Sequence, residues 1–106
     1  MDKEMMKGSI DLLLLSLIEQ KDLYGYEIMK VLKRLSDDTY EMSEGTLYTS
    51  LKRMERKEWI TSYWRETEKG RRKYYHITNN GQKELKKKQA NWKWMNSLVR
   101  KVAEEL

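Results

Sequence analysis

Apolar residues recur at helical spacing near the start of the chain. The residues that follow the i, i+3, i+4, i+7, i+8 pattern of one helical face are Ile10, Leu13, Leu14, Leu17 and Ile18. Leu12 and Leu15 add apolar surface on other sides, so the helix predicted over residues 10–20 must be covered most of the way round. Either this helix is central to its own core, or a second subunit covers part of it.

A second amphipathic helix is predicted over residues 28–35, where apolar positions again fall on one face. It follows two tyrosines, Tyr24 and Tyr26, that either pack in the core or present their hydroxyl groups to phosphates. Gly25, between them, allows the backbone to approach a neighbouring element closely. The polar stretch Ser36–Glu41 is typical of a turn, and it leads into a third helix.

The third predicted helix spans Met42–Trp59, with Ser43 in the N-cap position. Its apolar stripe consists of Leu47, Leu51 and Met54. The residues largely off that stripe are Thr46, Thr49, Lys52, Arg53 and Arg56. Small hydroxyls first and cations later suit a helix that enters a DNA major groove with its N-terminus leading. An ordinary surface helix shows the same pattern, so the following segment has to decide between them.

Two short runs rich in β-branched and aromatic residues follow, Ile60–Trp64 and Lys73–Ile77. The stretch between them, Arg65–Arg72, is predicted to be the loop of a β-hairpin, with Gly70 at the flexible position. Its clustered cations are Lys69, Arg71 and Arg72. A helix-turn-helix followed by a basic hairpin is the winged-helix layout, in which the hairpin reaches the minor groove or flanking phosphates. A solvated surface hairpin is the alternative.

A long helix is predicted over Gln82–Leu106, with Thr78 as the N-cap of the segment. Its heptad stripe is formed by Leu85, Trp92, Met95, Val99, Val102 and Leu106, and is interrupted by Lys88. A helix of this length at the end of a small domain has little of its own chain to pack against, which favours pairing with a second subunit. The predicted dimer interface is Leu12, Leu15, Leu85, Met95, Val99, Val102 and Leu106.

Trp92 is unusual in this stripe, because a bulky indole tends to hold two helices apart. Asn96 lies one turn further on, on the same side. An aromatic wall beside a polar group is a common lining of small-ligand pockets, although a packing residue at a dimer interface is the simpler interpretation.

Composition narrows the function. The 106 residues carry a net charge of +5, which favours a polyanionic partner. There is no cysteine and one histidine, His76, so thiolate chemistry is excluded and a metal site, a cofactor or a catalytic triad is not expected. The N-terminus lacks a signal-peptide pattern, and the longest apolar run, Leu12–Leu15, is too short for a membrane span. We therefore expect a cytoplasmic protein that is not an enzyme and has no membrane partner.

The sequence resembles the PadR family of bacterial transcriptional regulators, in its short subgroup with one C-terminal helix. The matching pieces are YGYE at 24–27, EGTLY at 44–48, LKRME at 51–55, WITSYW at 59–64, GRRKYY at 70–75 and ITNNG at 77–81. Two positions depart from the family pattern. Thr49 stands where many members have proline, and Glu58 stands where a glycine usually ends the third helix. A residue other than glycine there either adopts the left-handed conformation or ends the helix differently.

The resemblance implies a homodimer that binds a palindromic operator in double-stranded DNA and represses transcription. The DNA-binding residues carried over from it are Tyr24, Tyr26, Ser43, Gly45, Thr46, Tyr48, Thr49, Lys52, Arg53, Lys69, Gly70, Arg71 and Arg72. Multidrug-sensing members place a tryptophan on the C-terminal helix, and Trp92 falls at that position. The resemblance thus implies a small hydrophobic or planar aromatic effector at Trp92, and the neighbouring Asn96 is the polar residue expected beside it.

The expected fold is α+β and mainly α, with a winged helix-turn-helix domain over 1–78 and a C-terminal dimerisation helix over 79–106. The expected function is a DNA-binding repressor that an effector releases. Two alternatives remain: a winged helix used as a protein-interaction module, and a DNA-binding regulator without a small-molecule sensor.

Overall fold

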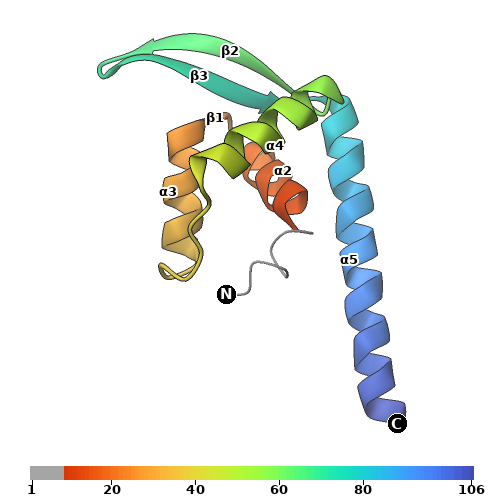
Figure 1. Ribbon diagram of the computed structural model, residues 1–106. Coiled ribbons are helices and arrows are strands. Elements are labelled where there is room, and N and C mark those ends of the chain that lie inside the picture. The colour runs from red at the N-terminus through yellow and green to blue at the C-terminus, as the bar shows by residue number, and fades with distance from the viewer. Residues whose placement is uncertain (1–8) are drawn as a thin grey trace.

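The computed structural model describes residues 9–106, and within that range it confirms a mainly helical winged-helix fold with a long C-terminal helix (Figure 1). The elements in chain order are α2 (Ile10–Gln20), β1 (Leu23–Tyr24), α3 (Gly25–Leu35), α4 (Glu44–Arg56), β2 (Ile60–Thr67), β3 (Gly70–Ile77) and α5 (Asn79–Glu105). Helices α2, α3 and α4 lie beneath one end of the sheet, and α5 runs down beside them.

The N-termini of α4 and α5 are capped by side-chain hydrogen bonds, at the residues that the sequence predicts. The Ser43 hydroxyl accepts a hydrogen bond from the Thr46 backbone N–H at 3.1 Å. The Thr78 hydroxyl accepts one from the Gly81 backbone N–H at 3.0 Å. Each bond satisfies a donor that the first turn of a helix leaves without an intrahelical partner.

The C-terminal end of α4 is set by Glu58, which adopts the left-handed conformation with φ of 61°. The N–H of Glu58 donates to the carbonyl of Glu55 at 3.0 Å, and the N–H of Trp59 donates to that of Met54 at 3.0 Å. These are the two bonds of a Schellman motif. Of the two outcomes expected for a residue other than glycine here, the structure has the left-handed one.

The sheet is three-stranded and antiparallel, with β3 between β1 and β2. The hairpin strands are longer than predicted, because β2 continues to Thr67 and β3 begins at Gly70. The prediction of Arg65–Arg72 as a loop is therefore wrong, and only Glu68 and Lys69 lie between the strands. Gly70 does take a positive φ, of 107°. Strand β1, which pairs with Tyr74 and Tyr75, was not predicted.

The core lies between α2, α3, α4, the base of the sheet and the start of α5. Its fully buried side chains include Leu14, Leu15, Ile18, Ile28, Leu47, Leu51, Met54, Ile60 and Leu85. Leu15 and Leu85, which the sequence predicts at a dimer interface, are 0% exposed in the single chain. They have no surface left for a partner, because the helices of their own chain already enclose them. Leu12 is partly buried and packs against this core.

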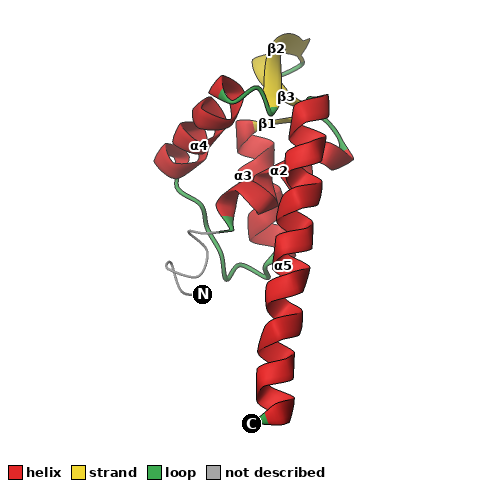
Figure 2. Ribbon diagram, turned by 90° about the vertical axis from the view of Figure 1, so that its right-hand side faces the viewer, coloured by secondary structure: helices red, strands yellow, loops and turns green. Residues whose placement is uncertain are grey.

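Helix α5 has two parts with different surroundings. Gly81 and Leu85 in its first turns are buried against the rest of the chain. From Asn91 onward every residue is exposed, and this part extends beyond the other elements (Figures 1 and 2). The domain boundary that we expect after residue 78 falls at the start of α5. The first turns of α5 nevertheless pack in the core of the winged-helix domain.

Trp59 joins the end of α4 to the beginning of α5. Its carbonyl oxygen accepts the Thr78 backbone N–H at 3.0 Å, and the Thr78 hydroxyl lies 2.9 Å from the same oxygen. Gly81 packs directly on this segment: a Cβ there would collide with the Trp59 carbonyl oxygen and lie 2.9 Å from its carbonyl carbon. The two backbones approach this closely only because residue 81 has no side chain.

We predict that Gly81→Ala lowers the free energy of unfolding by about 2–4 kcal/mol, because backbone rather than a flexible side chain must move aside. Urea denaturation followed by far-UV circular dichroism measures this. The control is Gly45→Ala in the first turn of α4, where a Cβ meets nothing within 4 Å. That variant should be as stable as wild type or slightly more stable. Equal stability of Gly81→Ala and wild type would contradict the packing described.

Candidate nucleic-acid interface

Helix α4 buries one face and exposes the other. Leu47, Leu51 and Met54 are buried, and Ser50 joins them as a small polar residue on the same side. The predicted DNA contacts that the structure leaves exposed on α4 and its N-cap are Ser43, Gly45, Thr46, Tyr48, Thr49 and Lys52. Short side chains occupy the first turns, and Lys52 follows two turns later. A surface of this kind lets a helix backbone come close to a groove while a cation further along reaches phosphates.

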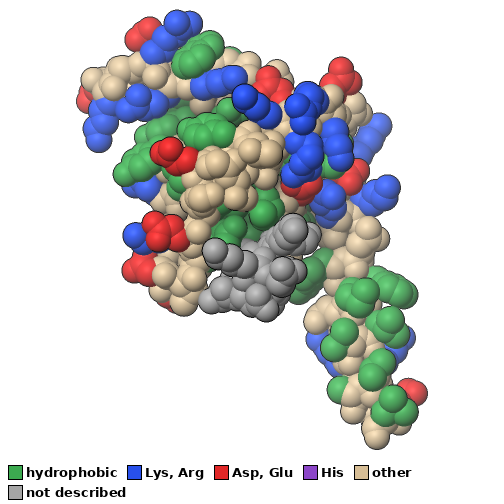
Figure 3. All heavy atoms as spheres, in the orientation of Figure 1, with side chains coloured by type: hydrophobic (Ala, Val, Ile, Leu, Met, Phe, Trp, Pro, Cys, Tyr) green, Lys and Arg blue, Asp and Glu red, His purple; other side chains and the backbone are tan. Residues whose placement is uncertain are grey.

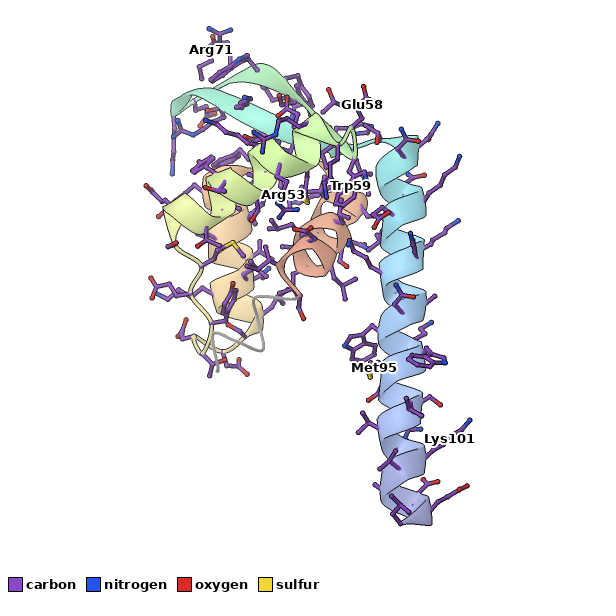
Figure 4. All side chains as sticks on the ribbon, turned by 45° about the vertical axis from the view of Figure 1, so that its right-hand side comes forward. Arg53, Glu58, Trp59, Arg71, Met95 and Lys101 are labelled. Atoms are coloured by element: carbon purple, nitrogen blue, oxygen red, sulfur yellow. The ribbon has the colours of Figure 1, made fainter. Side chains whose placement is uncertain are left out.

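Arg53 does not belong to that exposed face. Its guanidinium donates two hydrogen bonds to the Asp11 carboxylate of α2, at 2.7 and 2.6 Å. The Arg53 and Asp11 side chains are 35% and 19% exposed, and Figure 4 places Arg53 between α4 and α2. The structure therefore separates Arg53 from the other predicted DNA contacts.

The N-terminal turn of α3 lies against α4 through Gly25 and Tyr48. A Cβ at residue 25 would collide with the Tyr48 hydroxyl and lie 2.8 Å from the ring carbon that carries it. The close approach expected of Gly25 is thus present. Tyr26, one residue on, is 58% exposed, with the Lys30 ammonium 5.4 Å from its ring centre. Tyr26 and Tyr48 are the exposed tyrosines where α3 and α4 meet.

Tyr24 is instead part of the sheet surface. Its ring meets that of Tyr74 edge-on at 5.4 Å, and the Arg72 guanidinium lies 5.7 Å from its centre. Tyr74 in turn stacks on Tyr63 at 5.8 Å. These side chains share one face of the sheet, because cross-strand partners point the same way.

The two consecutive arginines of β3, Arg71 and Arg72, point to opposite faces, as adjacent strand residues must. Arg72 lies on the Tyr24 face, while Arg71 lies over Trp64 at 4.8 Å. Figure 4 shows Arg71 standing out from the hairpin, and Figure 3 shows Lys and Arg side chains along it. Lys69 lies in the two-residue turn at the exposed tip, beside Gly70. The predicted basic cluster is thus spread around the wing.

A polar network that the sequence did not reveal ties the base of the wing to the end of α2. The Asp22 carboxylate accepts the Tyr63 hydroxyl at 2.5 Å and lies 2.7 Å from Nδ1 of His76. Burial alone would raise the pKa of Asp22, but these two partners hold it below its ordinary value. The hydrogen bond to Asp22 in turn raises the pKa of Tyr63. The network orients β2 and β3 on the link between α2 and β1.

The predicted effector residues, Trp92 and Asn96, lie on the exposed part of α5. The Trp92 side chain is 57% exposed. Met95, Val99, Val102 and Leu106 are exposed on the same helix, as are Trp94 and Leu98. Figure 3 shows hydrophobic side chains gathered along the C-terminal part of α5. A single chain therefore presents Trp92 on an open apolar surface.

Two further observations concern other kinds of site. Within residues 9–106, no three histidine, aspartate or glutamate side chains are grouped closely enough to hold a metal ion. None of the helices in that range combines the length and the apolar character needed to cross a membrane.

Comparison with known proteins identifies the same fold in transcriptional regulators. A model of the transcriptional regulator PadR-like family matches residues 14–87. A transcriptional regulator from Clostridium thermocellum is 37% identical, with a TM-score of 0.85 over 93% of this chain and 97% of that one. A PadR family transcription regulator from Clostridium difficile is 39% identical, with a TM-score of 0.77 over 90% and 98% of the two chains. A PadR-like transcriptional regulator from Bacillus cereus is 30% identical, with a TM-score of 0.84 over 98% and 100%.

Proposed function

We propose that this chain, which belongs to the PadR-like family of transcriptional regulators, is a homodimeric repressor and binds a palindromic operator. The family consists of transcriptional regulators and not of enzymes. The observation that carries the DNA-binding proposal is the division of α4 into a buried stripe and an exposed face, on which mostly short side chains come first and the cations Lys52 and Arg56 follow.

In this proposal α4 enters the major groove with its N-terminus leading. Ser43, Gly45, Thr46 and Thr49 lie at the groove, and Lys52 reaches a phosphate. Tyr26 and Tyr48, at the meeting of α3 and α4, contact the sugar–phosphate backbone with their hydroxyl groups. Lys69, Gly70 and Arg71 at the wing tip reach the neighbouring phosphates or minor groove. Tyr24 and Arg72, packed on each other, support the wing beside them.

The homodimer proposal rests on the apolar surface of α5. Met95, Val99 and Val102 are 53%, 60% and 51% exposed, and Leu106 extends the same stripe. A stripe with heptad spacing is covered when a second copy of the helix packs against it. Leu12, partly buried on α2, borders the interface. Two α4 helices held one duplex turn apart, about 34–36 Å, would then fit successive major grooves.

The effector proposal places a small hydrophobic or planar aromatic compound between the subunits at Trp92. The exposed indole provides a flat apolar wall, and Asn96, one turn further along α5, provides a polar group. A compound wedged there changes the spacing of the two recognition helices, so that they no longer match the two half-sites. This couples the two sites through one rigid-body motion.

The DNA-binding prediction concerns Lys52. Lys52→Ala should weaken binding and reduce the slope of log Kobs against log salt concentration by about 1, because one phosphate contact is lost. Fluorescence anisotropy at several salt concentrations measures this, with DNA from upstream of the protein's own gene and an unrelated duplex of equal length. Wild type should prefer the upstream DNA. Equal, weak binding to both duplexes would favour an interaction module over an operator-binding regulator.

The dimer prediction concerns Val99. Val99→Glu buries a charge in the proposed helix pair and should shift the protein from dimer to monomer in sedimentation equilibrium. Ser97→Glu is the matched control, since it adds the same charge to α5 on the side opposite the apolar stripe. If Val99→Glu remains dimeric, or both variants dissociate equally, the stripe is not the interface.

The effector prediction concerns Trp92. In wild type, a planar cationic dye should quench tryptophan fluorescence and release the protein from its upstream DNA. Trp92→Ala should reduce the dye response at least tenfold and leave DNA affinity within about twofold of wild type. Loss of DNA binding together with dye binding would make Trp92 a packing residue. No dye binding by wild type would favour a regulator without a small-molecule sensor.

A further inference from the structure

The Asp11–Arg53 pair connects two helices that are far apart in the sequence. Asp11 lies in the first turn of α2, and Arg53 lies in the last turn of α4. Each charge therefore stands at the helix end where the helix dipole favours it. Two parallel hydrogen bonds, at 2.7 and 2.6 Å, fix the plane and the direction of the guanidinium as well as its distance.

The other contacts of α4 with the core are mostly apolar; the exception is the Ser62 hydroxyl of β2, which donates to the Glu55 carboxylate at 3.0 Å. Leu47, Leu51 and Met54 meet buried aliphatic side chains such as Leu14. Apolar contacts of this kind stabilise association but set rotation and sliding only loosely. The ion pair is the polar contact that specifies how α4 lies on α2.

We propose that Arg53 is a positioning residue, whose bidentate pair with Asp11 holds the recognition helix at a fixed orientation on α2, and that it is not a DNA ligand. This inference rests on the proposed function, because it concerns the helix that we propose enters the groove. Two of the five N–H donors of Arg53 are committed to Asp11, and its side chain is turned toward α2 (Figure 4).

The Asp11–Arg53 pair of α2 and α4 lies close to contacts that also involve α5. Two ammonium groups lie near the centre of the Trp59 ring, that of Lys57 at the α4 C-cap at 4.7 Å and that of Lys88 in α5 at 5.1 Å. Lys88 also pairs with Glu84 at 3.3 Å. Burial would raise the pKa of Asp11, but Arg53, together with the charges of Lys88 and Lys57, holds it below its ordinary value. The carboxylate is thus charged, and the pair is intact, at neutral pH.

Replacing Asp11 distinguishes a positioning role of Arg53 from direct DNA contact, because the two roles predict opposite changes in DNA affinity. Asp11→Asn removes a negative charge, so electrostatic attraction alone would make DNA binding equal or tighter. If the pair positions α4, the same variant misaligns the helix and weakens binding to the upstream DNA. Arg53→Met loses the guanidinium but retains much of the apolar stem, so it tests the pair from the other side.

The experiment is a set of anisotropy titrations with wild type, Asp11→Asn, Arg53→Met and the double variant, on upstream and unrelated DNA over a range of salt. We expect each single variant to bind upstream DNA about three- to tenfold more weakly, with the salt slope unchanged. The double variant should be no weaker than the weaker single variant, because both remove one interaction. Lys52→Ala is the control whose slope falls by about 1.

A second measurement needs no DNA. Amide hydrogen exchange of α4 should be faster in both single variants than in wild type, while thermal melts show that all four proteins are folded at the assay temperature. The inference is overturned if Asp11→Asn binds upstream DNA as tightly as wild type or more tightly, if Arg53→Met lowers the salt slope by about 1, or if α4 exchange does not change. If wild type shows no preference for upstream DNA, the proposed function fails instead, and exchange alone decides the role of Arg53.

Discussion

The contact between Trp59 and the start of α5 is the constraint on which the arrangement of this chain depends. The Trp59 carbonyl accepts the Thr78 N–H, and Gly81 packs on the same peptide group without a side chain between them. Residue 59 ends the segment that leaves α4, and residue 78 begins the segment that becomes α5. The contact therefore fixes where the long helix α5 begins relative to the end of α4.

The apolar stripes of α4 and α5 differ in whether their own chain buries them. The stripe of α4 is satisfied inside the chain, so its opposite face is free to meet another molecule. In α5 the reverse holds, since the apolar residues beyond Asn91 have no cover within the described part of the chain. An exposed apolar stripe on a helix favours association. One chain thus covers the apolar stripe of α4 by itself, whereas in our proposal a second copy covers that of α5 and sets the spacing between the two α4 helices.

Much of this architecture could be predicted from the sequence, because the helices follow apolar periodicity and their ends follow capping rules. Helix α2 has the predicted bounds, Ser43 and Thr78 cap as expected, and Gly70 has a positive φ. The extent of the hairpin could not be predicted, since both faces of the wing meet solvent beyond the core and apolar alternation disappears there. Strand β1 is only two residues long, which is too short for any alternation to be visible.

Neighbouring side chains of the candidate interface have different surroundings, and no local sequence pattern predicts this difference. Lys52 and Arg53 are consecutive cations, yet one faces solvent and the other faces Asp11, 42 residues away along the chain. Arg53 borders the buried stripe beside Met54, so its long stem can follow the apolar surface toward α2. The residue types suit these places: a planar guanidinium matches a carboxylate through two bonds, and a compact hydrated ammonium suits a solvent-facing charge. A count of the cations of α4 therefore overstates the positive charge on its exposed face, because the charge of Arg53 is paired with Asp11.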